Sequence, residues 1–385
     1  MSIPAERARA IIAEFQATRI ENLFAQAHAK HVLHEVQEEP ANFPAFDPAL
    51  DDKVTFAGYS LLGAGCSLIE QGDRAEGAGA LERGASLLQY AHGPRAAVER
   101  ESGFHVVEER TPAARIIGAY LRKDMSALLE RLDQVLLSDQ PFPEEQAELD
   151  ESAITVAVAQ AVSLAVEFIF TGARDLLGLA DDQLRDAGIV AAAGGHPAWW
   201  WAVRLLRLML QDLDGASPWN VLPPYFGPDS AATLGKYIKL LAFLKRPVAE
   251  LWVSQRAALP LALNLANNGA VINLRTSAGK TRVAELAILQ TLLAEPGARV
   301  FYLAPFRSLA LEVEYTLAAS FTELGYGVLH LYGGARVSSV DTELAAESAI
   351  TIATPEKARS LFRAAPELFQ DVKLVIVDEG HLIGP

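Results

Sequence analysis

The sequence predicts two parts of different fold class: an N-terminal all-α helical domain over residues 1–245 and an α/β domain with a parallel sheet over residues 246–385. Residues 1–245 show apolar side chains at helical spacing and no convincing alternating strand. From about Val248 onward, short β-branched runs alternate with amphipathic helices, which is the pattern of a parallel sheet covered on both faces. The net charge of −15 is also uneven, because residues 251–385 hold 11 Lys and Arg against 13 Asp and Glu. Most of the acidity therefore belongs to the helical part.

The helical part begins with an apolar stripe over residues 3–30 and a proline-rich break over residues 40–48. A helical hairpin follows, in which a turn at Gly72 joins residues 56–70 to residues 74–90. Its small residues make it resemble a tetratricopeptide-type unit, but no second copy occurs at a fixed period, so a repeat array stays open. Further helices are expected over residues 112–138, 151–179, 198–213 and 230–245.

The most membrane-like segment runs from Ala153 to Phe170. Glu167 interrupts it, and a charge deep in a bilayer costs ~2–3 kcal/mol or more, so we interpret it as a buried helix and expect no membrane association. The first residues carry charge where a signal peptide would be apolar. The single cysteine, Cys66, excludes a disulfide framework and a thiolate metal site, and we expect a cytoplasmic protein.

The α/β part contains five apolar runs that predict strands, and ligands of such sheets bind at the carboxyl ends of the strands. The runs cover residues 270–274, 299–304, 327–331, 349–353 and 372–377.

A phosphate-binding loop follows the first run. Its residues are Thr276, Ser277, Ala278, Gly279, Lys280 and Thr281, directly before a predicted helix. Backbone N–H groups at a helix N-terminus bind anions, and the helix dipole adds to the attraction. Lys280 would reach the outer phosphates, and the hydroxyl of Thr281 would bind Mg²⁺. The strict P-loop pattern has glycine where this sequence has Leu274, so a simple turn with a lysine cap stays an alternative.

Two carboxylates, Asp378 and Glu379, end the last apolar run. They would repel each other at the mouth of a buried strand unless a cation or a catalytic role held them there. In a nucleotide site Asp378 would hold Mg²⁺ through water, and Glu379 would orient or deprotonate the attacking water. The alternative is an acidic turn after an edge strand. The joint occurrence with the phosphate-binding loop favours an NTPase site.

The TSAGKT loop, the helix start RVAELAIL and the tetrad DEGH ending near His381 together resemble superfamily 2 DExH-box helicases. They are nearest the branch of archaeal repair and exosome-associated helicases. The resemblance covers roughly residues 250–385 and implies the first RecA-like lobe, with ATP and Mg²⁺ as cofactors. It further implies that Gln255 reads adenine and that His381 couples the ATP site to a second lobe. Nucleic-acid contacts are implied at Pro305, Arg307, Gly333, Gly334, Thr354 and Pro355.

Each nucleic-acid motif also has a plain structural explanation. Arg307 could begin a surface helix, residues 333–334 could form a turn, and Thr354 with Pro355 could end a strand and cap a helix. Their order along the chain is more specific than any single motif. Arg275 departs from the family pattern, which has proline there.

We interpret the chain as truncated, or as paired with a separate second lobe, because it ends four residues after His381. The family resembles a two-lobed clamp whose second lobe supplies arginine fingers, and loss of a finger lowers turnover by ~10³–10⁵. This chain alone is expected to bind ATP with poor activity.

The leading hypothesis is an ATP-dependent nucleic-acid helicase or translocase acting on DNA or RNA, suited to DNA repair or mobile-element defence. The acidic helical domain is a poor surface for phosphates, so a protein partner is expected there. The alternative is a nucleotide-switched protein-interaction scaffold that does not translocate. A P-loop phosphotransferase would leave Arg307 and its companion motifs without a role.

Two further clusters are given structural interpretations. His28, His31 and His34 share a helix but lack metal-site spacing, so a solvated face is expected. Residues 199–201 are three tryptophans, which we assign to packing rather than base stacking.

Overall fold

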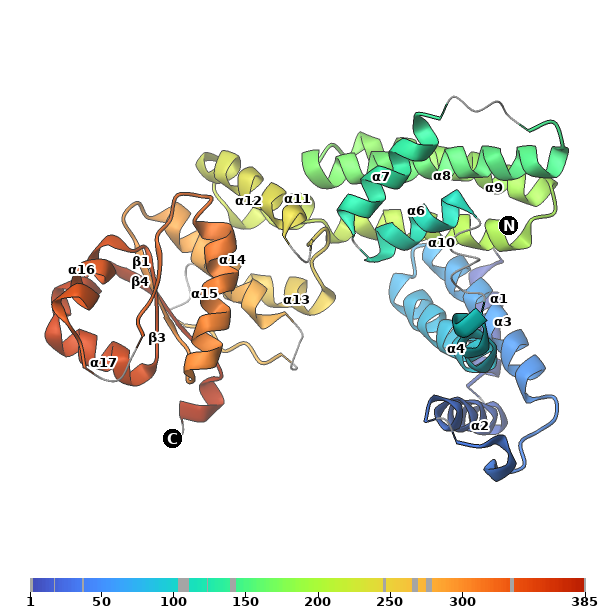
Figure 1. Cartoon of the computed structure of the whole chain (residues 1–385), viewed down its shortest axis with the longest axis horizontal. Coiled ribbons are helices and arrows are strands. Elements are labelled where there is room, and N and C mark those ends of the chain that lie inside the picture. Colours follow the sequence, from blue (N-terminus) through green and yellow to red (C-terminus); the bar gives the residue numbers. More distant parts are fainter. Residues whose placement is uncertain are drawn as a thin grey trace. The chain divides into compact units, whose positions relative to one another are not determined.

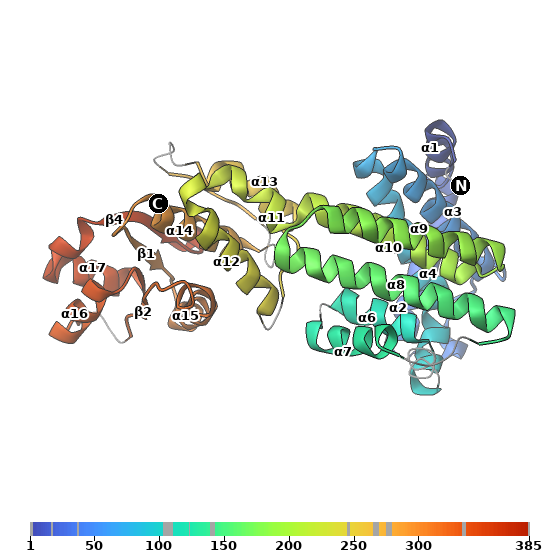
Figure 2. The ribbon, with the colours of Figure 1, turned by 90° about the horizontal axis from the view of Figure 1, so that it is seen from above.

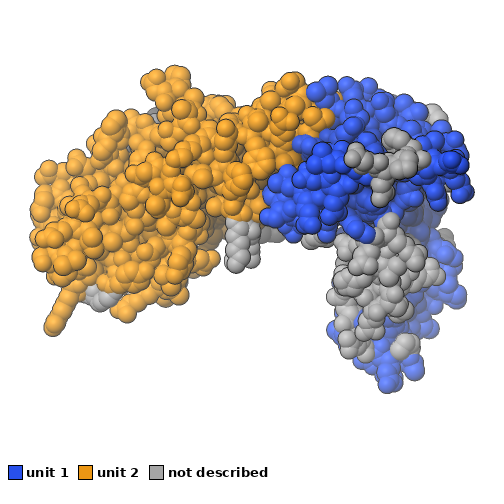
Figure 3. Space-filling model, turned by 45° about the horizontal axis from the view of Figure 1, so that its top comes forward, with its two compact units in different colours: residues 1–163, 179–210 blue, residues 164–178, 211–385 orange. Residues whose placement is uncertain are grey.

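The computed structural model describes residues 3–16, 18–36, 38–102, 111–122, 124–138, 143–244, 247–264, 269–274, 279–332 and 336–383. The chain forms two compact units, residues 1–163 with 179–210 and residues 164–178 with 211–385, which Figure 3 colours separately.

The first unit is helical, as predicted, and its elements appear in blue and green in Figure 1. The described elements are α1 (Ala5–Glu14), α2 (Thr18–Glu35), η1 (Pro40–Asn42), α3 (Leu50–Glu70), α4 (Arg74–Ser102), α6 (Pro112–Arg122), α7 (Met125–Leu136), most of α8 (Gln146–Thr171) and α9 (Asp175–Ala193), and the larger part of α10 (Pro197–Ala216).

The predicted helical hairpin is formed by α3 and α4. Glycines let the two helices approach closely. A Cβ atom on Gly84 would lie 2.9 Å from the carbonyl oxygen of Gly58, and one on Gly65 would lie 2.8 Å from that of Gly77. These separations leave no room for side chains, so the small residues noted in the sequence serve the packing of this pair.

Several predicted helices are interrupted in the structure. The range 112–138 is two helices, because the carboxylate of Asp124 accepts a hydrogen bond from Ala127 N at 3.1 Å and caps α7. The range 151–179 breaks at Gly172, which has φ +75°, and α9 begins three residues later. A Cβ atom there would lie 2.7 Å from the Trp219 ring, whose Nε1 donates to Ile169 O at 2.9 Å.

Helix α8 contains the one stretch of the described residues, Glu148–Thr171, that is long and apolar enough to cross a membrane. Val158, Val162 and Phe168 on it are fully buried within the protein. This burial agrees with the interpretation of α8 as a core helix.

The second unit contains a four-stranded parallel sheet of order β2-β3-β1-β4. Its elements are α11 (Pro218–Val221), η2 (Pro223–Tyr225), η3 (Pro228–Ser230), α12 (Ala231–Phe243), α13 (Val253–Ala262), α14 (Lys280–Ala294), β1 (Arg299–Leu303), α15 (Arg307–Phe321), β2 (Val328–His330), α16 (Ser339–Glu347), β3 (Ile350–Ala353), α17 (Pro355–Ala364), η4 (Pro366–Phe369), β4 (Val372–Val377) and η5 (Gly380–Ile383).

Helices cover both faces of this sheet (Figures 1 and 2). Side chains alternate along β1, so Val300 and Tyr302 pack into the cluster that contains α12, α14 and α15. Phe301 packs on the other face with Ala345 of α16 and Leu361 of α17. The predicted fold class, helices followed by a RecA-like parallel-sheet domain, is confirmed.

The first predicted strand is not formed. Residues 269–274 are described but pair with no strand, and Val271 is 90% exposed. β4 is an edge strand of the described sheet, with Val375 53% and Val377 44% exposed. A five-residue apolar run has strand propensity, but pairing is a tertiary property that the run alone does not fix.

Helix α12 packs with the sheet unit, although it precedes the predicted domain boundary at residue 245. Tyr237, Ile238 and Leu241 are buried in the same cluster as Leu286 of α14. The hydroxyl of Tyr237 accepts a hydrogen bond from Arg282 at 3.3 Å, and Arg282 pairs with the fully buried Glu285. Helix α12 therefore supports the helix that begins at Lys280.

Candidate functional site

The predicted site residues follow the strands at one edge of the sheet. Because all four strands are parallel, their carboxyl ends lie together. Arg307 follows β1, Thr354 follows β3, and Asp378 with Glu379 follow β4. The site is thus assembled from segments far apart in the sequence.

The phosphate-binding loop is described at its last three residues, whereas Thr276, Ser277 and Ala278, together with Gly333 and Gly334, lie outside the described residues. Gly279 is the N-cap of α14 with φ +81°, a left-handed conformation that glycine adopts without strain. Lys280 and Thr281 form the first turn of α14, where free N–H groups and the helix dipole favour anions.

Gln255 contacts this loop directly. Its Nε2 donates to Gly279 O at 3.4 Å, and its Oε1 accepts from Trp252 N at 2.8 Å, at the start of α13. Gln255 is buried, and a Cβ atom on Gly279 would lie 2.2 Å from its Nε2. The predicted adenine-reading residue is therefore packed against the glycine of the phosphate loop, with the indole of Trp252 exposed beside it.

Lys280 meets Glu379 across 99 residues of sequence. Lys280 Nζ lies 3.1 Å from Glu379 Oε1, and both side chains are about one-third exposed. Glu379 has φ +47°, an uncommon value for a residue with a side chain. His381 Nδ1 lies 3.2 Å from Glu379 Oε2 while its ring is largely exposed. Three of the predicted catalytic residues thus form one cluster.

Asp378 is held on both carboxylate oxygens. Tyr302 donates its hydroxyl to Oδ2 at 2.8 Å, and Glu379 N donates to Oδ1 at 2.9 Å. Asp378 N donates to Leu303 O at 2.9 Å, which extends the pairing of β4 with β1. Burial, with the charge of Asp378 beside it, raises the pKa of the Tyr302 phenol, so this donor stays protonated.

Sequence reasoning missed Tyr302. The available signal was one hydroxyl-bearing ring in the apolar run RVFYL, adjacent in the sheet to the strand that ends in Asp378. Pairing between β1 and β4 could not be read from the sequence, so the contact was hidden.

The residues present fit a nucleotide with Mg²⁺. Gly279 caps the helix N-terminus, where backbone N–H groups are free to bind an anion, a cation stands at Lys280, and a hydroxyl stands at Thr281. Asp378, oriented by Tyr302, supplies the carboxylate oxygens that Mg²⁺ prefers.

The predicted nucleic-acid residues lie at the neighbouring strand ends. Arg307 is exposed in the first turn of α15, and Pro305 precedes it. Thr354 caps α17 by accepting from Lys357 N at 3.4 Å, and Pro355 is the first residue of that helix. Thr354 and Pro355 thus have a structural role at the start of α17, and this role does not prevent them from contacting nucleic acid.

Lys357, three residues after Thr354 in the sequence TPEK, is buried. Its Nζ donates to Arg336 O at 2.6 Å and to Asp341 Oδ2 at 2.9 Å. Asp341 in turn caps α16 with Ser338. Lys357 thus ties α17 to the segment before α16.

The histidines and tryptophans of the first unit make packing contacts. The rings of His28 and His31 lie 5.3 and 5.2 Å from that of Tyr90. Arg204 pairs with Glu70 at 2.8 Å, and its guanidinium lies over the rings of two of the three tryptophans, 200 and 201.

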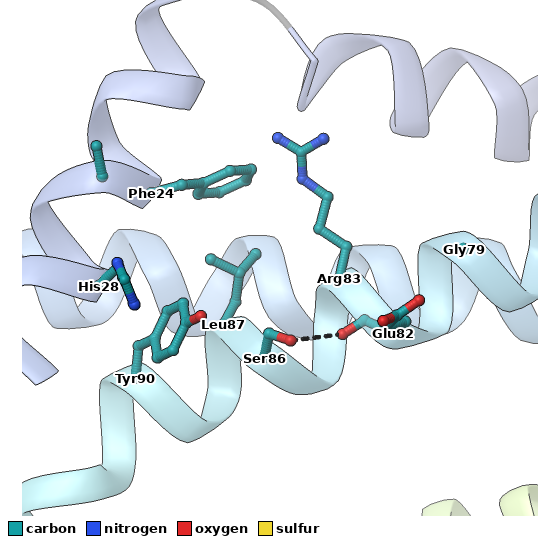
Figure 4. Close-up of a pocket in the computed structure, with 9 residues that line it drawn as sticks. Phe24, His28, Gly79, Glu82, Arg83, Ser86, Leu87 and Tyr90 are labelled. Atoms are coloured by element: carbon teal, nitrogen blue, oxygen red, sulfur yellow. Dashed lines mark hydrogen bonds between the residues drawn. The ribbon is translucent and has the colours of Figure 1, made fainter. Parts of the chain in front are cut away.

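A hollow between α2 and α4 is shown in Figure 4, with Phe24 and His28 on one side and Arg83 and Tyr90 on the other. Arg83 lies over the Phe24 ring at 4.5 Å and pairs with Glu21 at 2.7 Å. Its guanidinium is therefore already engaged within the protein.

Comparisons with known proteins find sequence relatives of this chain. Residues 252–385 match the family model of the DEAD/DEAH box helicases. The chain is 32% identical to the Hachiman protein HamB of Bacillus cereus, over 95% of this chain and 34% of that protein. It is 39% identical to the ATP-dependent DNA helicase Hel308 of Pyrococcus horikoshii, over 36% of this chain and 19% of that protein. It is 38% identical to the ATP-dependent DNA helicase MER3 of Saccharomyces cerevisiae, over 30% of this chain and 10% of that protein. The chain thus spans about a third of the HamB relative and a fifth or less of these two helicases.

Proposed function

We propose that this chain, whose residues 252–385 are the first lobe of a DExH-box helicase, is the ATP-binding part of an ATP-driven nucleic-acid helicase or translocase. The family match confirms the resemblance that the motifs indicated. The activity of the whole protein, its substrate and its partners belong to the proposal.

The contact between Lys280 and Glu379 carries the proposal. A lysine at a helix N-terminus and a glutamate at the end of a parallel strand lie 3.1 Å apart, beside an oriented aspartate. A structural salt bridge needs no glycine in a left-handed conformation and no second carboxylate. A site for phosphate and Mg²⁺ makes use of both.

Each residue of the cluster has a role in this proposal. Bound ATP with Mg²⁺ supplies the phosphoanhydride bond whose hydrolysis drives movement. Lys280 would neutralise the outer phosphates, and Asp378 with Thr281 would hold the metal. Glu379 would orient the attacking water and accept its proton. Lys280 must then leave Glu379, which frees the carboxylate.

Gln255 would read the adenine while its contact with Gly279 links the base pocket to the phosphate loop. His381, which lies beside Glu379, would pass the state of the ATP site to a second lobe.

A nucleic-acid strand would cross the ends of β1 and β3. Exposed Arg307 would contact the backbone phosphates, together with Pro305, Thr354 and Pro355 and with Gly333 and Gly334. The described positions among these, Pro305, Arg307, Thr354 and Pro355, follow β1 and β3 on the same edge as the ATP cluster, so one lobe could sense the nucleotide and the nucleic acid together.

The helical part is proposed to bind a protein partner or to regulate the motor. Its acidity disfavours a phosphate backbone. The HamB match covers 95% of this chain, so it includes most of the helical part, whereas the Hel308 match covers 36%. This difference supports a role for the helices that is specific to HamB-like proteins.

The proposal is tested by displacement of a labelled strand from a partial duplex by the full protein with ATP. Glu379→Gln should abolish displacement, whereas Glu367→Gln, an exposed carboxylate on the same lobe, should leave it unchanged. Nucleotide binding should be lost on Lys280→Ala and kept on Lys373→Ala, a surface lysine paired with Glu295. Nucleotide-dependent partner binding without displacement would contradict the motor and favour the switched scaffold.

A further inference from the structure

Two exposed tyrosines stand beside the proposed strand-binding edge, and no motif of the sequence analysis includes Tyr315. Tyr315 of α15 is 70% exposed, and Tyr332, two residues after β2, is 59% exposed. Tyr332 donates its hydroxyl to Glu314, the residue directly before Tyr315 in α15, so the two tyrosines lie near each other. Helix α15 packs beside β2, so the rings come from adjacent elements.

Tyr332 is fixed in place by its contacts with Glu314 and the buried His330. Its hydroxyl donates to Glu314 Oε2 at 2.5 Å, and His330 Nδ1 lies 3.2 Å from the same oxygen. The ring of His330, which is 4% exposed, lies 4.1 Å from that of Tyr332. A ring held in this way loses little conformational freedom when a ligand stacks on its open face.

Tyr315 shares a helix face with Arg307. The spacing from Arg307 through Leu311 to Tyr315 is four residues at each step, and all three are exposed. Residues at this spacing lie one above the other along a helix. The face therefore runs from Arg307, at the carboxyl edge of the sheet, to Tyr315, about 12 Å along the helix axis.

We propose that Tyr315 and Tyr332 form a base-stacking platform for single-stranded nucleic acid whose backbone is held at Arg307, an inference that rests on the proposed function. Every base has a π-face, so stacking on aromatic rings binds a strand without reading its sequence. A cation and two exposed rings on the same lobe offer one place for a backbone phosphate and another for the bases of a single strand.

The charges around the tyrosines agree with bases rather than phosphates at this place. Glu314 is engaged by Tyr332 and His330, and its negative charge disfavours a phosphate. The hydrogen bond to Glu314 raises the pKa of the Tyr332 phenol, so the ring stays neutral at physiological pH. Phosphates are directed to Arg307 and the flat bases to the rings.

The test is the affinity of the full protein for fluorescein-labelled oligothymidine, measured by anisotropy. Tyr315→Ala and Tyr332→Ala should each weaken binding about five- to a hundredfold, which is the range for one stacked base. Tyr315→Phe should bind like the wild type, because the π-face remains. Tyr332→Phe should bind with an affinity between those of the wild type and Tyr332→Ala, because the ring remains but the hydrogen bond to Glu314 is lost.

Phe362→Ala is the matched control. Phe362 is 54% exposed and packs on Phe369, which precedes β4. β4 and β2 are the two outer strands of the sheet, so this ring lies on the side away from Tyr332. Its removal should leave binding unchanged, and equal thermal midpoints would exclude unfolding as a cause. Wild-type affinity in both alanine variants, with binding weakened by Arg307→Ala, overturns the platform and leaves strand binding in place. No strand binding by the wild type overturns both.

Discussion

Gly279→Ala perturbs the centre of the proposed ATP site by one methyl group. The backbone at Gly279 has φ +81°, which costs a residue with a Cβ atom ~1–2 kcal/mol. The new Cβ atom would also lie 2.2 Å from Gln255 Nε2 and 2.9 Å from its Cδ. Gln255 is buried, so it must move within a packed environment and lose its bonds to Gly279 and Trp252.

Gly297→Ala is a control that shows the cost of backbone strain without a side-chain collision. It has φ +83°, but a Cβ atom there would meet nothing within 4 Å. Gly297→Ala should therefore lower the free energy of unfolding by the strain alone, ~1–2 kcal/mol. Gly279→Ala adds the loss of hydrogen bonds worth ~0.5–1.5 kcal/mol each, for a total of about 2–5 kcal/mol. Only Gly279→Ala should also abolish nucleotide binding.

The assay combines denaturant unfolding with titration of a fluorescent ATP analogue. A Gly279→Ala, Gln255→Ala double variant removes the collision, and both single substitutions lose the same hydrogen bonds of Gln255, so the double variant should lose less stability than the sum of the two single variants. It should not recover binding. The reasoning is refuted if Gly279→Ala and Gly297→Ala lower stability equally and both bind nucleotide like the wild type.

Three further changes test other parts of the structure. Tyr302→Phe removes the donor on Asp378 Oδ2, so it should lower stability by ~0.5–3 kcal/mol and slow ATP turnover; unchanged turnover would show that the aspartate needs no such support. Burial raises the pKa of the Cys66 thiol to about 11. The thiol should therefore resist alkylation by iodoacetamide at pH 8 until the first unit unfolds, and mass spectrometry measures the extent of alkylation. Because the folded pKa is the higher one, stability should fall as pH rises from about 9 toward 11, and rapid labelling of folded protein would contradict the burial. Lys357→Met removes two hydrogen bonds of a buried ammonium, to Arg336 O and to Asp341 Oδ2, and should lower the free energy of unfolding by ~1–3 kcal/mol in urea titrations. An unchanged urea midpoint would show that these bonds do not hold α17 to the segment before α16.

Local patterns carried much of the fold prediction. Four of the five apolar runs are strands, because short β-branched runs between helices are typical of the buried strands of a parallel sheet. The run over residues 269–274 failed, since pairing depends on a partner that composition does not name. The helix break at Gly172 was missed because glycine is tolerated within helices, and the Trp219 ring that requires it there is distant in sequence.

The same division holds at the site. Lys280, Asp378 and Glu379 were predicted because their residue types and spacing have chemical meaning at strand and helix ends. Tyr302 and the bond from Gln255 to Gly279 depend on strand order and packing, which no local pattern encodes. Tyr237 on α12 belongs to this group as well, since its tie to Arg282 crosses 45 residues.

The most direct test of the account is the rate of ATP hydrolysis by the full protein with and without single-stranded DNA or RNA. We expect strong stimulation by a strand, loss of hydrolysis in Glu379→Gln, and weakened stimulation in Arg307→Ala with basal hydrolysis kept. If neither single-stranded DNA nor RNA changes the rate of hydrolysis at saturating ATP, the Lys280–Glu379 site is not coupled to nucleic acid and the account is contradicted.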